Sequence, residues 1–397
     1  MSNLPPTSAR YYPATVEQWW VEQVKNSSVH TLENLHRNAS TLSNHFTVSR
    51  EKGFPDYFKK PGHLLAYGIY FHPQSWARVR FPLLEAIQHR GWASPKGRSL
   101  SILDAGSGPG SASLSAIQLL STLYPECEIR TTAVDRSPHA LEAMRGSHAD
   151  LHELWPKSTL RTHSRNLRHR SSLFYGGKQR FDLIILSFSL NEFVAGGSPE
   201  EIAGQLASAS RDLLKKNGLL LVVEPALRET ARNLCVLTDQ LAGGDSLYTW
   251  GPYFHKGPCP LRDSERFWCH EVRSWQPPKS LEYLNRHMQR KIHELKFSFS
   301  TLSPSPPPTT PSTKGFFRIA SPVSRMKGHF LMTGVDGEGK AQEYELLYRN
   351  LDPSQKKSMR KMERGDILEI SNLETVGNSG RLRIPAFADI IQHYHVL

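Results

Sequence analysis

The chain has 397 residues, enough for two to four domains, and its 38% hydrophobic and 22% charged residues are typical of a globular protein. No apolar run approaches the roughly 18 to 20 residues of a membrane span, the N-terminus lacks a signal core, and four cysteines are too few for a disulfide framework. These features argue against a membrane or secreted protein and favour a cytoplasmic one. With 49 Lys and Arg against 37 Asp and Glu, the net charge of +12 favours a polyanionic partner.

Residues 1–98 form the first predicted region. Apolar residues recur there at helical spacing, as in Val16, Trp20 and Val24, and the same spacing returns over residues 76–87. We therefore predict a helical N-terminal region.

The next region, residues 99–302, alternates strand-like and helix-like segments, which is typical of an α/β protein. The predicted strands include Ser99–Leu103, Ile129–Val134, Phe181–Ser187 and Leu219–Val223. A helix between residues 227 and 241 places its apolar residues on one side. We predict a Rossmann-like parallel sheet covered by helices.

A glycine-rich turn, DAGSGPG at residues 104–110, follows the first predicted strand. A dinucleotide fingerprint needs a third glycine where this chain has Ser111, so that interpretation is weaker. The turn instead resembles the first motif of class I S-adenosylmethionine-dependent methyltransferases. Asp104 could pair with the amino acid end of that ligand, and Asp135, at the tip of the second strand, could accept both ribose hydroxyls. A plainer alternative is a tight turn in which Asp135 only caps a helix.

The predicted binding residues for S-adenosylmethionine are Asp104, Ala105, Gly106, Ser107, Gly108, Gly110, Asp135, Asn166 and Ser187. Asn166 follows the third strand and could offer its amide to the adenine. The segment after the fourth strand, SFSLNEF at residues 187–193, usually faces the methyl acceptor, so Asn191 and Glu192 are the candidate catalytic residues. No cysteine lies near it, which excludes the covalent chemistry of cytosine C5 methylation. An N- or O-methyl transfer remains, or no transfer at all.

A basic tract runs from Lys157 to Arg180, with seven basic residues, two histidines and no carboxylate. It predicts a phosphate-binding surface, although a solvated charged face is an equal alternative. The candidate RNA-binding residues are Arg161, Arg165, Arg168 and Arg170.

The C-terminal part begins after a proline-rich stretch, residues 303–314, which we interpret as a linker. Residues 315–397 alternate short β-type runs with glycine-containing turns. We predict a small β-rich module there.

The cysteine-containing loop at residues 251–271 (GPYFHKGPCPLRDSERFWCHE) carries a more specific resemblance. With VEPALRETARNL, residues 223–234, and LKFSFSTL, residues 295–302, it resembles the methyltransferase-like family of the small ribosomal subunit, which contains a mitochondrial assembly factor and bacterial relatives. The resemblance extends from about Leu64 to the C-terminus. It implies binding of S-adenosylmethionine, association with small-subunit (16S-type) ribosomal RNA rather than DNA, and an iron–sulfur cluster held by four cysteines.

This chain departs from the family at the metal site. Tyr253 stands at the position of the first family cysteine, and residues 332–335, where the fourth is expected, contain no cysteine. Only Cys259 and Cys269 match, too few for an all-cysteine 4Fe–4S cluster.

Two interpretations of these cysteines stay open. With His255 and His270 they could bind zinc, although the adjacent side chains of Cys269 and His270 would point in opposite directions in an extended segment. Alternatively the site is degenerate and its cysteines only pack in the loop. The other two, Cys127 and Cys235, we interpret as core residues.

Two functions follow from these patterns. The first is an S-adenosylmethionine-dependent methyltransferase acting on small-subunit ribosomal RNA in ribosome assembly or translation. The second is a non-catalytic protein that binds S-adenosylmethionine and RNA as an assembly factor. A third, a small-molecule methyltransferase, would not need the basic tracts.

Overall fold

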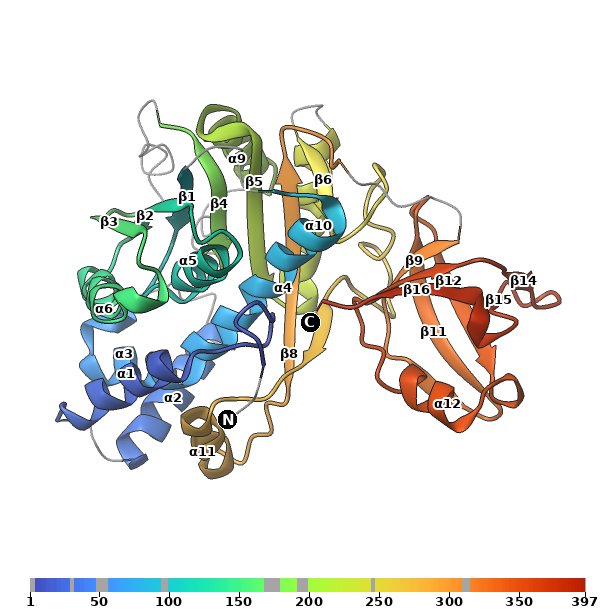
Figure 1. Ribbon diagram of the computed structural model, residues 1–397, viewed down its shortest axis with the longest axis horizontal. Helices are drawn as coiled ribbons and strands as arrows, with labels where there is room; N and C mark the ends of the chain where they lie inside the picture. The colour runs from blue at the N-terminus through green and yellow to red at the C-terminus, as the bar shows by residue number, and fades with distance from the viewer. Residues whose placement is uncertain are drawn as a thin grey trace.

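The structure is a computed structural model that describes residues 4–28, 32–47, 56–93, 99–167, 179–190, 199–243, 247–308 and 315–396. A large sheet with helices on both faces occupies the middle of the chain, and a second sheet formed by C-terminal strands lies beside it (Figure 1). The predicted α/β fold, with a helical N-terminal region and a β-rich C-terminal part, is confirmed.

The N-terminal helices lie below the large sheet and along one of its faces in Figure 1. They are α1 (Ala14–Lys25), α2 (Leu32–Thr47), α3 (Pro61–Ala66) and α4 (His72–Arg90). A π-helical turn, Tyr67–Phe71, joins α3 to α4, and Gly68 in it lies directly against the Trp20 ring. A Cβ at Gly68 would lie 2.0 Å from that ring, so only glycine permits this contact.

The first sheet has the strand order β3-β2-β1-β4-β5-β8-β6, and β7 pairs with β8. Strands β1 to β5 are parallel, whereas β8 runs antiparallel to β5 and to β6. This order, with one antiparallel strand next to the fifth, is that of class I methyltransferases. The strands are β1 (Ser99–Ala105), β2 (Glu128–Asp135), β3 (Ser158–Ser164), β4 (Phe181–Ser187), β5 (Leu214–Pro225), β6 (Tyr248–Gly251), β7 (Glu271–Ser274) and β8 (Glu294–Ser303).

Helices cover both faces because alternate residues of the central strands point to opposite sides. On β4, Leu183 and Ile185 contribute to the core with α4 and α5, whereas Ile184 and Leu186 contribute to the core with α9 and α10. Burial on both faces explains why these strands appear as continuous apolar runs. The helices that connect the strands are α5 (Ser111–Leu123), α6 (Pro138–Asp150), α9 (Pro199–Leu213), α10 (Arg228–Gly243) and α11 (Lys279–His287).

The second sheet has the order β14-β15-β12-β11-β9-β13-β16, and β10 pairs with β11. Its own core contains Phe317, Met332, Tyr344 and Leu368. Its elements are β9 (Phe316–Ile319), β10 (Ser324–Met326), β11 (His329–Asp336), β12 (Ala341–Leu347), α12 (Pro353–Met359), β13 (Ile367–Ile370), β14 (Glu374–Thr375), β15 (Leu382–Arg383) and β16 (Ile390–Tyr394).

A buried ionic network connects the two sheets. Arg318 on β9 donates to Glu85 of α4 at 2.8 Å and to Glu271 of β7 at 2.9 Å. Arg273, also on β7, pairs with Glu271 and with Asp366 just before β13. All five side chains are at most 5% exposed, so each charge depends on its partners.

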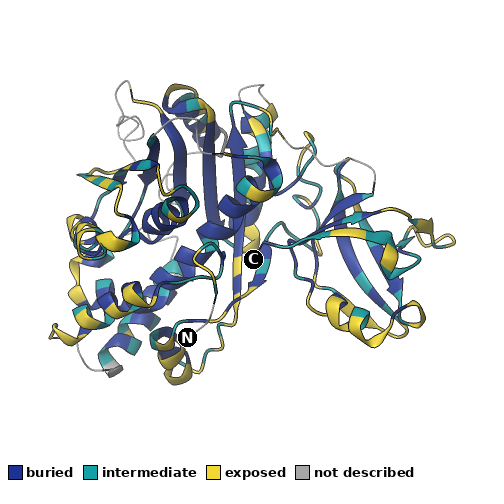
Figure 2. Ribbon diagram, in the orientation of Figure 1, coloured by how far each residue is buried: buried dark blue, intermediate teal, exposed yellow. Residues whose placement is uncertain are grey.

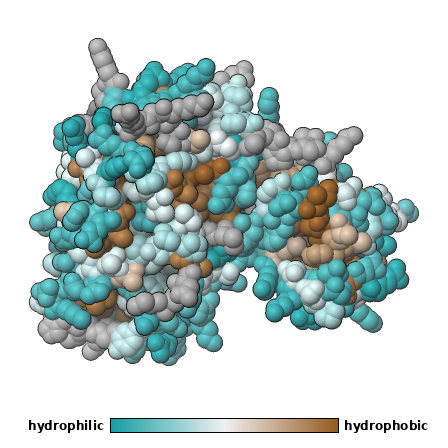
Figure 3. All heavy atoms as spheres, in the orientation of Figure 1, coloured by the Kyte–Doolittle hydropathy of each residue, from teal (hydrophilic) through white to brown (hydrophobic). Residues whose placement is uncertain are grey.

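The face of the molecule seen in Figure 3 is largely polar. Figure 2 shows buried strands at the centre of both sheets and exposed faces on the outer helices, and Figure 3 shows mostly hydrophilic side chains over this face with smaller hydrophobic areas. Within the described ranges, no helix combines the length and apolar character needed to cross a bilayer.

Candidate functional site

The glycine-rich turn lies between the end of β1 and the start of α5. Gly106, Gly108 and Gly110 have φ angles of +83°, +52° and +88°, which side chains disfavour. A Cβ at Gly106 would also lie 2.3 Å from the Cβ of Ser189, which follows β4. The turn therefore requires glycine both for its backbone and for the close approach of the next loop.

Asp135 fastens this turn to the end of β2. Its carboxylate accepts the Gly108 N–H at 2.8 Å and the Ser137 N–H at 2.8 Å. Burial raises the pKa of Asp135, while these two backbone hydrogen bonds oppose the shift. Among the described residues each oxygen accepts one N–H, which leaves capacity for the carboxylate to accept ligand hydroxyls.

Asp104 lies beneath the turn and is fully buried. The Ser113 hydroxyl donates to one carboxylate oxygen, and the other, Oδ1, has no hydrogen-bond partner among the described residues. Burial raises the pKa of Asp104 to about 7, and the nearby Asp135 adds to the shift. With this pKa, about half of the Asp104 carboxyl groups are protonated near pH 7.

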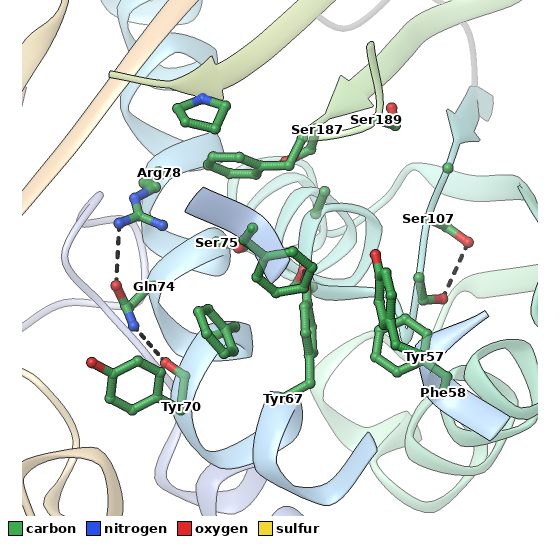
Figure 4. Close-up of a pocket in the computed structure, with 18 of the residues that line it drawn as sticks. Tyr57, Phe58, Tyr67, Tyr70, Gln74, Ser75, Arg78, Ser107, Ser187 and Ser189 are labelled. Carbon is green, nitrogen blue, oxygen red and sulfur yellow. Dashed lines mark hydrogen bonds between the residues drawn. The ribbon is translucent and has the colours of Figure 1, made fainter. Parts of the chain in front are cut away.

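A cavity of about 280 Å³ opens above the turn. The wall opposite the strand ends is aromatic, and its rings meet mostly edge to face, as Phe58 and Tyr67 do at 5.2 Å. In Figure 4 these rings come from the helical region, whereas Ser107, Ser187 and Ser189 come from the strand ends. The aromatic residues that line the cavity are Phe46, Tyr57, Phe58, Tyr67, Tyr70, Phe71 and Phe188.

Arg78 of α4 brings a cation to this cavity (Figure 4). Its Nη2 donates to Gln74 Oε1 at 3.1 Å, and the Gln74 amide in turn donates to the Tyr70 carbonyl at 2.7 Å. Nε of Arg78 is buried without a hydrogen-bond partner in the described chain. Burial lowers the pKa of Arg78 to about 10, so the guanidinium stays charged at neutral pH and can receive an anionic group.

The segment after β4 closes one side of the cavity. Phe188 has a φ of +58°, unusual for a bulky residue, and its ring lies 5.4 Å from the Arg78 guanidinium carbon. The Ser189 hydroxyl donates to the Ala105 carbonyl at 2.7 Å, and the Leu190 N–H donates to Glu224 at 3.0 Å. Strained residues held by such bonds concentrate at functional sites.

The predicted cofactor residues divide into two groups. Gly106, Ser107, Gly108, Asp135 and Ser187 line the cavity. The others do not line it, and they are Asp104 and Ala105 below the turn, Gly110 at the start of α5, and the exposed Asn166. Asn191 and Glu192 lie outside the described residues.

Sequence reasoning missed the helical wall of the cavity, including Arg78, Gln74 and Tyr67. The sequence signal that pointed to this wall was the family resemblance, which begins at about Leu64 and so includes the residues before the glycine turn. Arg290 and Lys296, which also line the cavity, come from the segment between α11 and β8 and from β8 itself.

The basic tract lies partly on β3, the outermost strand of the first sheet. Arg161 and Arg165 are exposed there, while Lys157 pairs with Glu126 at 2.7 Å. Arg168 and Arg170 lie outside the described residues. The described part thus presents two of the four predicted arginines at the sheet edge.

A second, smaller cavity of about 30 Å³ lies between α10, β8 and the 251–271 loop. Cys235, Cys259 and Cys269 face it with sulfur atoms within 4.8 Å of one another, and we call these three residues the thiol site. Interpreting Cys235 as a core residue was incomplete, because its helix face is also the wall of this cavity. The structure does not bring His270 to the thiol site. Its ring stacks on Trp268, with 5.0 Å between the ring centroids, and does not line this cavity.

The four-cysteine cluster implied by the family resemblance does not fit the described residues. Tyr253 is buried against the thiol site where the first family cysteine is expected, and β11 supplies no thiol. In a four-iron cluster each thiolate binds a different iron, which spaces the sulfurs more widely than in a one-ion site. The thiol site is too narrow and has one ligand too few for such a cluster.

No family model matches this sequence, and no curated protein matches it either. Among solved structures, a putative class I S-adenosylmethionine-dependent methyltransferase from Listeria monocytogenes is 13% identical, with a TM-score of 0.36 over 76% of this chain and 92% of that chain. Magnesium protoporphyrin IX methyltransferase from Synechocystis, with bound S-adenosylmethionine, is 12% identical, with a TM-score of 0.34 over 67% and 96%.

A putative RNA methyltransferase from Pyrococcus horikoshii is 12% identical, with a TM-score of 0.28 over 51% of this chain and 74% of that chain. The strand order of the first sheet, rather than these scores, defines the class I methyltransferase fold of this protein.

Proposed function

We propose that this protein binds S-adenosylmethionine in the 280 Å³ cavity and transfers its methyl group to small-subunit ribosomal RNA. The observation that carries the proposal is the glycine turn held by Asp135 at one side of a cavity that also contains the half-buried cation Arg78. The ligand has matching ends, because a ribose offers hydroxyls to a carboxylate and an amino acid offers a carboxylate to a guanidinium.

In this proposal Asp135 accepts the ribose hydroxyls, the glycine turn lets the protein backbone approach the ligand closely, and Arg78 pairs with the ligand carboxylate. When bound, S-adenosylmethionine supplies an electrophilic methyl group on sulfur. The protein then positions an acceptor nitrogen or oxygen in line with that methyl group, and the aromatic wall excludes water and favours a cationic ligand. Ser187, whose hydroxyl is buried without a partner in the described chain, faces the same cavity.

RNA as the acceptor is supported by charge rather than by the cavity. The net charge of +12 and the exposed arginines at the sheet edge, Arg161 on β3 and Arg165 just after it, favour a phosphate backbone. The alternative, a non-catalytic assembly factor, would use the same residues to bind both partners without transferring a methyl group.

The deciding experiment supplies S-adenosylmethionine with a labelled methyl group, together with small-subunit RNA or precursor particles. Label in the RNA supports the enzyme, whereas tight binding of both partners without label supports the assembly factor. Failure of the wild-type protein to bind S-adenosylmethionine in calorimetry would reject both.

RNA binding is tested by replacing Arg161 and Arg165 together with glutamate. For each arginine that neutralises a phosphate, the substitution should lower the slope of log affinity against log salt by about 0.7 to 0.9. The matched control is Arg325→Glu, which changes an exposed arginine on β10 of the second sheet. Equal slopes for the wild type and the double variant would mean that this edge is an ordinary solvated surface.

A further inference from the structure

A helix and the loop that follows β6 bring the thiol site together. Cys235 belongs to α10, Cys259 lies in the loop after β6, and Cys269 precedes β7. All three are free thiols, and their sulfurs lie within 4.8 Å of one another. A tetrahedral zinc ion with bonds of about 2.3 Å holds its sulfur ligands about 3.8 Å apart, so a small inward movement of each side chain is enough.

Neighbouring groups fix the backbone that carries each thiol. Asp239, one turn after Cys235 on α10, accepts the Cys259 N–H at 3.2 Å and the Arg262 guanidinium at 3.1 Å. It thereby fastens the loop to the helix that carries the first thiol. Such contacts around ligands are what keep metal sites preorganised.

The segment that carries Cys269 is held from two sides. The Ser298 hydroxyl of β8 donates to the Cys269 carbonyl at 2.9 Å. The guanidinium of Arg364, which comes from the C-terminal part of the chain, donates to the carbonyls of Trp268 and His270 on either side of Cys269. Its positive charge also acts on the sulfur of Cys269, which must be a thiolate when it binds a metal.

His255 is the available fourth ligand. It lines the same cavity, and neither ring nitrogen is exposed or has a side-chain hydrogen-bond partner among the described residues. Its ring stacks on Tyr253 at 5.5 Å and packs against Gly339, where a Cβ would lie 2.8 Å from Nδ1. The imidazole is outside the 4.8 Å group, so it must rotate toward the thiols to bind.

We propose that Cys235, Cys259 and Cys269, with His255 as the fourth ligand, bind one zinc ion. Three thiolates and an imidazole are a zinc-type donor set, and the cavity of about 30 Å³ has room for an ion but not for a cluster. The ion fastens the 251–271 loop to α10. This role is structural and does not depend on the proposed methyl transfer.

Cobalt(II) is the probe, because its visible absorbance reports tetrahedral geometry and thiolate ligands. Chelator-treated, reduced wild-type protein should bind one cobalt per chain, and zinc should displace it. Cys235→Ser, Cys259→Ser and Cys269→Ser should each weaken cobalt binding by about 100-fold or more, because too few soft ligands remain. Cys127→Ser is the matched control, since Cys127 is 8% exposed and Cys235 is 7% exposed, and it should bind cobalt normally.

Three results would overturn the proposal. They are wild-type protein that binds no cobalt or zinc, a Cys235→Ser variant that folds and gives an unchanged cobalt spectrum, and iron with acid-labile sulfide in protein purified without oxygen. Should the serine variants not fold, alkylation of the wild type followed by mass spectrometry decides instead. Zinc must protect Cys235, Cys259 and Cys269, and reaction of all three in zinc-loaded protein would reject the site. Calorimetry with S-adenosylmethionine on the same samples tests the proposed function separately.

Discussion

The cavity above the glycine turn and the cavity at the thiol site differ in size and in the hydrogen bonding of their polar groups. The larger holds about 280 Å³, and Nε of Arg78 and the hydroxyl of Ser187 in its wall have no partner within the described chain. The cavity at the thiol site holds about 30 Å³, and the three cysteine sulfurs that face it lie within 4.8 Å of one another. Hydrogen bonds fix the backbone at Cys259 and Cys269. Buried polar atoms without partners are costly, so the first cavity is suited to a ligand that enters and leaves. The second is suited to an ion that stays.

The largest effect should come from filling the glycine turn. Gly106→Val places atoms where the Ser189 Cβ lies 2.3 Å from the ideal Cβ position, so the affinity for S-adenosylmethionine in calorimetry should fall by about 100-fold or more. Gly328→Val is the matched control, because Gly328 has a φ of +87° but open space around it. That variant should lose stability and keep its affinity. Full affinity in a folded Gly106→Val variant would contradict the proposal that the 280 Å³ cavity binds S-adenosylmethionine.

A smaller loss is expected for Asp135→Ala. The substitution removes the carboxylate that accepts the Gly108 N–H and that we propose accepts the ribose hydroxyls. Binding of S-adenosylmethionine should therefore weaken by about 10- to 100-fold. Asp352→Ala is the control, because Asp352 also accepts two backbone N–H groups, at the start of α12. Cobalt binding should be unchanged in both variants. A loss of cobalt binding in Asp135→Ala would mean that the two cavities are not independent.

Asp104→Asn should change stability with pH. The pKa of Asp104 is about 7 in the folded protein and ordinarily about 4, so between these values the unfolded chain releases a proton that the folded chain keeps. Wild-type stability should therefore fall as pH rises from about 4 to 7 and then level off. Relative to wild type, the variant should gain at least about 1 kcal/mol at pH 8 and nothing at pH 4, measured by denaturant unfolding. A gain that is equal at both pH values would contradict the raised pKa.

The smallest effect on S-adenosylmethionine binding should follow from removing the proposed zinc ion. Chelation is expected to lower the melting temperature of the wild type, because the 251–271 loop loses an ion that binds only the folded state. Affinity for S-adenosylmethionine should change less than about threefold, since none of the described thiols lines the large cavity. A tenfold or larger change in this affinity would show that the two sites are coupled.

How far the sequence predicts each site depends on how its residues are distributed. Gly106, Gly108 and Asp135 follow two adjacent strands, and strand ends in a parallel sheet meet at one edge, so their proximity could be predicted. Arg78 could not be assigned in this way, because its helix precedes the sheet and nothing local says which edge it reaches. Cys235 is buried as predicted, but its place in the thiol site was missed, because apolar periodicity shows that a helix face is buried and not what covers it.

The ionic network between the sheets limits where this chain can be divided. The proline-rich residues 303–314 look like a natural place for a truncation, and each sheet has its own core. A fragment ending there would nevertheless keep Glu85 and lose Arg318, which is hydrogen-bonded to it in a site where both side chains are at most 4% exposed. Leaving a buried charge without its partner costs about 3 to 5 kcal/mol, a large share of the stability of a typical domain. Arg318 on β9 thus neutralises buried carboxylates in the part of the protein that holds the ligand cavity. A shortened form of the protein should therefore keep the C-terminal strands.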